Sequence, residues 1–351
     1  MKSKRLSLPA LMLRTLWRIS FRHFVTWDQA GRSALLLTMI VTCVALAGKA
    51  NAQKVYSIGS LNTADQFINS FEGFKSRMAE LGYLEGKNVR YQYYNSRGND
   101  ELLRTVAQKL VQDRVDLIVT SSTTATVAAA KASEETRIPV LFLSAGNPQK
   151  LVKSFSSSGS HLAGISSATL ELTGKRLQLL KELSPQVKKI VLPSVPEGIN
   201  YQSNLAETKE AAARIGVTVW ELTFHNLIQY EKAVVAITRK TADAIFSPPD
   251  SLVTEGIDYL VKRANKEKLP LMTSLLVNVR RGALATYAAD YAALGRQGAV
   301  LGDKILKGTK PADLPIELPN KYRLVINMKT AQTIDLKIPR ELLLRADEII
   351  E

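Results

Sequence analysis

The sequence contains one cysteine and only three histidines, which argues against several classes of function. Cys43 lies in an apolar run near the N-terminus, so the rest of the chain has no disulfide framework, cysteine metal site or cysteine nucleophile. His161 and His225 lack a Cys, Asp or His at metal-ligand spacing, and we predict no metal site. A nucleophile elbow, a P-loop and a glycine-rich dinucleotide fingerprint are also missing from the sequence. We therefore predict no catalytic residues, no enzymatic activity and no cofactor.

The net charge of +15 is unevenly distributed along the chain. Residues 1–52 hold eight Lys and Arg residues against one acid, which leaves a net charge of +8 on the remainder. That charge is spread without a dense basic run, so we predict no nucleic-acid partner. Hydrophobic residues at 46% and charged residues at 23% are typical of globular domains, and 351 residues suffice for two of them.

The N-terminal segment, residues 1–52, has the layout of a secretory signal peptide. Basic residues precede an apolar run from Ala34 to Leu46, which is shorter than the roughly 20 residues that a membrane-spanning helix needs. Small residues follow at Ala50 and Ala52, which predicts cleavage after Ala52 and a periplasmic mature protein. An uncleaved N-terminal anchor is the alternative, because the stretch before the apolar run is unusually long.

From residue 54 onward, short β-branched runs alternate with longer amphipathic stretches. The stretch from Asp65 to Leu81 has apolar side chains at the i, i+3, i+4 and i+7 spacing of one buried helix face, and it stops at Gly82. A first series predicts strands at 55–61, 88–94, 116–120 and 139–143. A second series predicts strands at 189–192, 217–222, 244–246 and 269–273, with helices between them. Strict alternation of strand and helix predicts parallel sheets with right-handed crossovers.

Two such series, joined near residues 163–168, predict an α/β fold of two doubly wound lobes. Strand 283–287, helix 291–306 and strand 322–326 follow the second series, and we expect them to cross back and complete the first lobe. The predicted lobe 1 is residues 53–165 plus about 285–325. The predicted lobe 2 is residues 166–284 plus about 326–351.

Small hydroxyl and amide side chains follow three strands of the first series. Because parallel sheets bind ligands at the carboxyl ends of their strands, these side chains are candidate ligand contacts. The candidates are Ser60, Ser121, Ser122, Thr123, Ser144 and Asn147, together with Leu61 and Ala145 from the same strand ends. For each Ser or Thr alone, helix capping is the favoured interpretation, whereas three converging loops favour ligand contact. The helix N-termini beside them also suit a carboxylate.

The second series and the strand that follows it contribute four more candidates at their strand ends. Asp250 is either the N-cap of the next helix or the carboxylate that accepts a ligand ammonium, and both interpretations stay open. Ser251 and Ser274 follow strands in the same way. Tyr287 offers a stacking face and a hydroxyl group, as tyrosines in binding pockets do.

Three stretches carry a resemblance to a known family. They read F-E-G-F-K-S-R-M-A-E-L-G-Y-L-E-G-K-N-V (71–89), I-P-V-L-F-L-S-A-G-N-P (138–148) and D-K-I-L-K-G-T-K-P-A-D-L-P-I-E (303–317). Together they resemble the ABC-transporter substrate-binding family that includes tryptophan- and tyrosine-binding lipoproteins, and the resemblance covers nearly all of residues 53–351. This sequence departs from the family pattern at Asn147, where the family usually has Asp, and at Ala288, where it often has Gly.

The resemblance implies a class I periplasmic binding fold whose lobes are joined by a three-strand hinge. It also implies an amino-acid-like or small carboxylate ligand, held by the strand-end loops. The expected partners are an ABC permease in the cytoplasmic membrane and its ATPase, and we expect a monomer. A ligand-sensing domain of a receptor or repressor-like regulator is the alternative, since such proteins share this fold.

Overall fold

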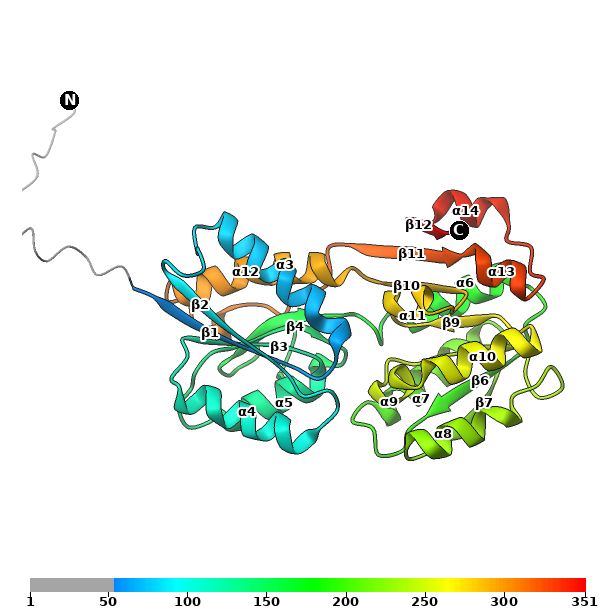
Figure 1. Cartoon of the computed structure of the whole chain (residues 1–351), viewed down its shortest axis with the longest axis horizontal. Helices are drawn as coiled ribbons and strands as arrows, with labels where there is room; N and C mark the ends of the chain where they lie inside the picture. Colours follow the sequence, from blue (N-terminus) through cyan, green and yellow to red (C-terminus); the bar gives the residue numbers. More distant parts are fainter. Residues whose placement is uncertain (1–53) are drawn as a thin grey trace, which may run out of the picture. The chain divides into compact units, whose positions relative to one another are not determined.

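Two sheets, one in each lobe, organise residues 54–351, which are the residues that this computed structural model describes (Figure 1). The predicted signal peptide, its cleavage site and Cys43 lie outside the described residues. Lobe 1 has a five-stranded sheet of order β2-β1-β3-β4-β5, and lobe 2 a seven-stranded sheet of order β12-β11-β10-β9-β8-β6-β7. The fold is therefore the predicted pair of α/β lobes, of the class I periplasmic binding type.

Lobe 1 is formed by the first series of elements and by one late helix. Its elements are β1 (Tyr56–Asn62), η1 (Asp65–Phe67), α3 (Ile68–Glu80), β2 (Val89–Asn95), α4 (Asp100–Gln112), β3 (Leu117–Ser121), α5 (Thr123–Ala132), β4 (Val140–Ala145), η2 (Pro148–Lys150), β5 (Leu162–Ser166), α12 (Tyr291–Leu306) and η4 (Pro311–Asp313). All strand pairs in this sheet are parallel. Strand β5 was not predicted, because its sequence L-A-G-I-S lies within the segment that we expected to join the lobes.

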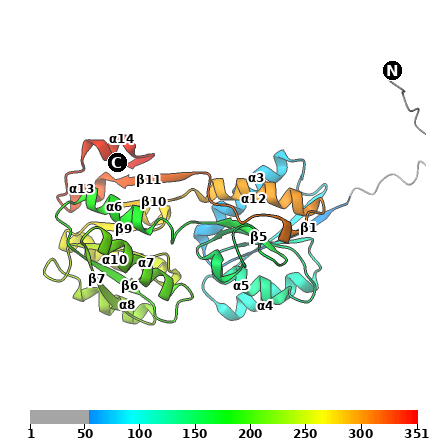
Figure 2. The ribbon, with the colours of Figure 1, turned by 180° about the vertical axis from the view of Figure 1, so that it is seen from behind.

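Both faces of the lobe 1 sheet are buried, which is why its central strands are almost uniformly apolar. Side chains alternate between faces with a period of two, so Leu141 packs with α3 and α12 while Phe142 packs on the side of α4 and α5. Figure 2 shows the two helix layers from behind. Glycines let α12 approach α3 closely: a Cβ atom at Gly295 would lie 1.8 Å from the carbonyl oxygen of Ser70.

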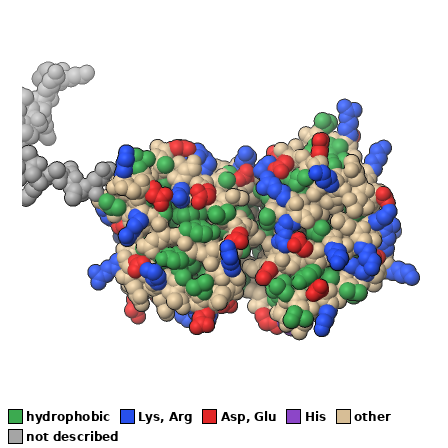
Figure 3. All heavy atoms as spheres, in the orientation of Figure 1, with side chains coloured by type: hydrophobic (Ala, Val, Ile, Leu, Met, Phe, Trp, Pro, Cys, Tyr) green, Lys and Arg blue, Asp and Glu red, His purple; other side chains and the backbone are tan. Residues whose placement is uncertain are grey.

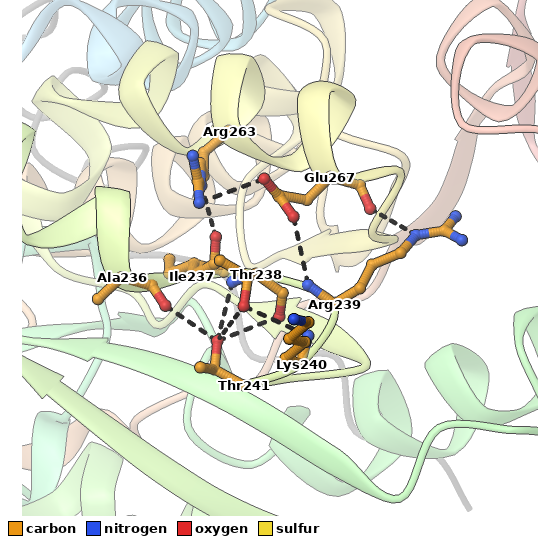
Figure 4. A network of polar contacts seen from close by, with 8 residues as sticks. All are labelled: Ala236, Ile237, Thr238, Arg239, Lys240, Thr241, Arg263 and Glu267. Carbon is orange, nitrogen blue, oxygen red and sulfur yellow. Dashed lines mark hydrogen bonds and ion pairs between the residues drawn. The ribbon is translucent and has the colours of Figure 1, made fainter.

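Lobe 2 contains the second series and the C-terminal elements. These are α6 (Thr173–Leu183), β6 (Lys189–Ser194), α7 (Tyr201–Arg214), β7 (Thr218–Thr223), α8 (Leu227–Ala233), η3 (Val234–Ala236), β8 (Ala244–Phe246), α9 (Ser251–Glu255), α10 (Ile257–Glu267), β9 (Leu271–Thr273), α11 (Leu276–Arg280), β10 (Ala285–Ala289), β11 (Tyr322–Asn327), α13 (Met328–Thr333), α14 (Arg340–Arg345) and β12 (Glu348–Ile350). The turn from η3 to β8 is tied to α10 by polar contacts of Arg263 and Glu267 (Figure 4).

The chain passes between the lobes three times: after β5, after β10 and before β11 (Figure 1). The expectation that all of residues 285–325 complete lobe 1 is wrong for the first and the last strand of this segment. Strands β10 and β11 pair with each other in the sheet of lobe 2, and only the segment between them joins lobe 1. Because β10 leads out of lobe 2 and β11 leads back into it, the two neighbours are antiparallel, an exception to the predicted parallel pairing.

Within residues 54–351, no helix combines the length and the apolar character that crossing a membrane requires. On the face shown in Figure 3, Lys and Arg side chains are dispersed over both lobes with Asp and Glu among them. The absence of a nucleic-acid partner stays a prediction.

Candidate functional site

A cavity of about 350 Å³ lies where the two lobes meet, at the carboxyl ends of strands from both sheets. Lobe 1 contributes the residues that follow β1, β3 and β4, together with the beginning of α12. Lobe 2 contributes the residues that follow β6, β8 and β9. A volume in this range is typical of small-molecule sites, which start near 300 Å³.

The lobe 1 wall of the cavity is rich in hydroxyl groups at the N-terminus of α5. The Ser122 hydroxyl caps this helix by accepting from the Ala125 N–H at 3.2 Å, and it also accepts from the Thr63 hydroxyl at 3.1 Å. Thr123 lines the cavity in the first turn, where backbone N–H groups have no acceptor inside the helix. Ser122 thus serves as the cap and as part of the wall, so the two interpretations of this residue are compatible.

Two aromatic rings form the apolar part of the lobe 1 wall. Phe67 from η1 and Tyr291 from α12 have ring centroids 5.6 Å apart, with the rings tilted by 31°. The start of α12 is fixed by Asp290, whose side chain accepts from the Ala293 N–H at 3.1 Å. Burial raises the pKa of the Tyr291 phenol, while the nearby charge of Arg176 acts in the opposite direction. Tyr291 is therefore a neutral hydroxyl at ordinary pH.

The lobe 2 wall contains the carboxylate of Asp250. One oxygen, Oδ1, accepts from the N–H groups of Leu252 at 2.9 Å and Val253 at 3.1 Å, which caps α9. The other oxygen, Oδ2, would lie 2.9 Å from a Cβ atom at Gly198, so glycine there leaves room for the carboxylate. Burial raises the pKa of Asp250 and the two N–H groups lower it, so an ammonium beside Oδ2 would favour the charged form.

Three side-chain atoms of the cavity wall are buried without a hydrogen-bond partner among the described residues. They are Ser144 Oγ, Asn200 Oδ1 and Thr254 Oγ1. Buried polar groups in folded proteins are nearly always paired, so such atoms are suited to polar groups of a ligand or to water. Their position around one cavity, on both lobes, favours a ligand with several hydrogen-bonding groups.

Five of the twelve predicted contacts line this cavity: Ser122, Thr123, Ser144, Asp250 and Ser251. Ser60, Leu61, Ser121, Ala145 and Ser274 are buried and do not line it. The Ser60 hydroxyl accepts from Asn62 Nδ2 at 2.9 Å, and Leu61 belongs to the core beneath α4.

Asn147 and Tyr287 also lie outside the cavity wall, each with a definite neighbour. The side-chain amide of Asn147 donates to the Ser203 hydroxyl of lobe 2 at 3.0 Å, so it joins the lobes. Tyr287 stacks on Tyr322 with ring centroids 5.8 Å apart and lines a second cavity of about 300 Å³, which also includes Lys175. The tyrosine in the wall is Tyr291, four positions further along the chain.

The loop after β6, residues 195–200, lines the cavity and was not predicted. The strand-end rule applied to Lys189–Ser194 would have identified it. Glu197 in this loop contacts His225, with Oε1 and Nδ1 2.6 Å apart, and both side chains are exposed. Its pKa is lowered first by a backbone hydrogen bond and then by His225. Nothing in the sequence indicated that Phe67 and Tyr291 line the cavity, because apolar positions on a helix usually belong to the core.

Comparisons with known proteins give a consistent result. The family model described as "ABC transporter substrate binding protein" matches residues 61–350. The tyrosine-binding protein of Clostridioides difficile (strain R20291) is 26% identical over 287 residues, which are 81% of this chain and 82% of the relative.

Two solved structures are similar over nearly all of the described residues. The ABC domain from Streptococcus pneumonia in complex with L-Trp is 28% identical with a TM-score of 0.78, covering 85% of this chain and 100% of the other. A conserved domain protein from Vibrio cholerae is 27% identical with the same TM-score, covering 85% of this chain and 99% of the other.

Proposed function

The chain belongs to the family of ABC transporter substrate binding proteins, and from this premise we propose that it binds a free aromatic amino acid in the interlobe cavity. The ligand is bound and released without chemical change, and it is delivered to a membrane permease that is driven by an ATPase. The observation that carries the proposal is the composition of the cavity, with hydroxyl groups and aromatic rings on one wall and Asp250 on the other.

Each part of an amino acid has a chemically matched partner in this cavity. The ammonium pairs with the carboxylate of Asp250, and the ligand carboxylate faces hydroxyl groups such as those of Thr123 and Thr169. The side chain packs against Phe67 and Tyr291, where an aromatic ring gains from tilted or stacked ring contacts. The names of two relatives, a tyrosine-binding protein and a domain in complex with L-Trp, support the same ligand class.

The first test is equilibrium binding and thermal unfolding of the purified protein with L-tryptophan, L-tyrosine and L-phenylalanine. A ligand at 100 times its dissociation constant adds about 2.7 kcal/mol, which corresponds to roughly 5 °C in the melting temperature of a chain this long. L-Aspartate is the comparison ligand, because the Phe67 and Tyr291 rings offer no partner for a second carboxylate. Stabilisation by none of the aromatic amino acids, or chemical alteration of the bound one, would reject the proposal.

The exported location is tested separately from the ligand. Protein recovered from the periplasm should begin at Gln53, because the leader is cleaved after Ala52. Intact-mass measurement decides this, and a full-length chain retained in the membrane fraction would favour the anchor instead. Cells that lack the protein should take up the labelled amino acid more slowly, whereas unchanged uptake would favour a sensory role.

A further inference from the structure

Arg176, in the first turns of α6, is the largest fully buried side chain among the described residues, with 0% of its surface exposed. Its Nη2 atom donates to the carbonyl oxygen of Thr169 and to the Thr173 hydroxyl at 3.4 Å. Its Nη1 atom donates to the carbonyl oxygen of Tyr287 at 3.4 Å, and Nε has no partner within residues 54–351. The guanidinium therefore contacts the passage after β5 at Thr169, and it contacts β10, the strand that leads into the second passage, at Tyr287.

No carboxylate within residues 54–351 forms an ion pair with this guanidinium. Arg263 in lobe 2 is the contrast: it also donates to a carbonyl oxygen, that of Ile237, but it has Glu267 at 3.2 Å (Figure 4). Burial lowers the pKa of Arg176 to about 10, so the side chain stays charged at neutral pH. Glu171, which is exposed, forms no ion pair with Arg176, but its charge is near enough to raise the pKa of the guanidinium. A buried cation without an acid in direct contact is costly, and carbonyl dipoles offset only part of that cost.

This charge lies directly behind the wall of the cavity. Thr169, whose carbonyl oxygen accepts from Arg176, lines the cavity, and its hydroxyl is 3.3 Å from that of Ser167, another lining residue. Tyr291, on the adjoining wall, is close enough for the charge of Arg176 to lower the pKa of its phenol. The N-terminus of α6 adds a partial positive charge at the same place. Charges interact strongly across such a buried region, because little water lies between them to screen the field.

We infer that Arg176 is a positioning and specificity-determining residue, whose buried positive charge selects ligands with a carboxylate and holds that carboxylate at the Ser167–Thr169 side of the cavity. Asp250, on the lobe 2 wall, then takes the ammonium, so the two ends of a zwitterion meet charges of opposite sign. This inference rests on the proposed function, since it assumes that the ligand is an amino acid. It concerns a side chain that does not line the cavity itself.

The test compares L-tryptophan with L-tryptophanamide at about pH 6.5, where the α-amino group of the amide, with a pKa of roughly 7.7, is still protonated. The amide then keeps the ring and the ammonium but has a neutral group in place of the carboxylate. The wild-type protein should bind the acid at least tenfold more tightly than the amide. Arg176→Met and Arg176→Gln remove the charge, and we expect each to reduce this ratio at least tenfold. Arg176→Lys keeps a positive charge and should retain the ratio within about threefold, whatever its effect on stability.

Arg263→Met is the matched control, because it also removes a largely buried arginine that donates to a carbonyl oxygen, but outside the cavity wall. It should lower the melting temperature and leave the acid-to-amide ratio unchanged. Folded Arg176→Met and Arg176→Gln proteins that keep the wild-type ratio would overturn the inference. So would neutral variants that cannot fold even with excess L-tryptophan, since Arg176 would then be a residue required for folding.

Measurements on the wild-type protein alone distinguish failure of the role of Arg176 from failure of the proposed function. Equal affinity for acid and amide would refute the role of Arg176 and leave the proposed function in place. Binding of neither compound, nor of the other aromatic amino acids, would reject the proposed function and with it this inference.

Discussion

The two carboxylate oxygens of Asp250 have different surroundings. Oδ1 is fully engaged as the cap of α9, whereas Oδ2 faces the space that Gly198 leaves open. The two interpretations of this residue, helix cap and partner of a ligand ammonium, are therefore compatible in one side chain. A substitution that preserves the cap and removes the charge separates them.

Asp250→Asn is that substitution, because Asn caps helices about as well as Asp. The melting temperature should change little, while the affinity for L-tryptophan should fall by about 2 kcal/mol or more, which is about 30-fold or more, because a buried charge pair is lost. Isothermal titration calorimetry of the wild-type and Asp250→Asn proteins measures both affinities for L-tryptophan. N-acetyl-L-tryptophan has no ammonium, so the wild-type protein should bind it weakly and the substitution should affect it little. Equal affinity of both proteins for L-tryptophan would leave Asp250 as a cap only.

The pH dependence of binding follows from the same group. Burial raises the pKa of Asp250 in the free protein, and a bound ammonium lowers it. Affinity is therefore full above the raised pKa and decreases as the pH falls through it. The decrease should begin at a higher pH than an ordinary aspartate would give, and it should be absent from the Asp250→Asn protein.

At the scale of elements, the sequence pattern identified most strands but not the sheet to which each belongs. β10 and β11 were recognised as strands, yet both were assigned to the wrong lobe. Hydrophobic periodicity reports which face of a strand is buried and carries no information about its neighbour. The pairing of β10 with β11 depends on where α12 goes, and α12 packs on α3, more than 200 positions earlier in the chain.

The predicted ligand contacts have a similar limitation, because several of them lie one or a few positions away from the residue that lines the cavity. We expected the first strand to end at Leu61, whereas β1 continues to Asn62, and the residue that lines the cavity is Thr63. In β3, Ser121 is the last strand residue and is buried, while Ser122 is the first residue of the wall. The strand-end rule locates the binding edge of a sheet to within about two to four residues. The final assignment requires the backbone geometry, because side chains alternate between faces.

At the scale of the whole molecule, two hydrogen bonds join the lobes beside the cavity. Asn147 of lobe 1 donates to Ser203 of lobe 2, and the ammonium of Lys150 donates to the carbonyl oxygen of Ile199. Ile199 itself lines the cavity. It belongs to lobe 2, which is on the right in Figure 3. These contacts lie at a distance along the chain from the three hinge passages, so they can form and break while the hinge stays intact. This arrangement favours a clamp that closes over its ligand.

We therefore expect the lobes to separate without ligand and to close when it binds. Small-angle scattering should give a smaller radius of gyration for the protein with saturating L-tryptophan, and equal values would refute closure. Ser203→Ala removes one hydrogen bond worth about 0.5–1.5 kcal/mol, so ligand release should become about two- to tenfold faster in stopped-flow measurements. Ser154→Ala, at a serine of lobe 1 that does not line the cavity, should leave the release rate unchanged. Ser203 does not line the cavity either, so its substitution removes no direct contact with the ligand. If release becomes faster in the Ser203→Ala protein but not in the Ser154→Ala protein, the effect comes from weaker closure of the lobes.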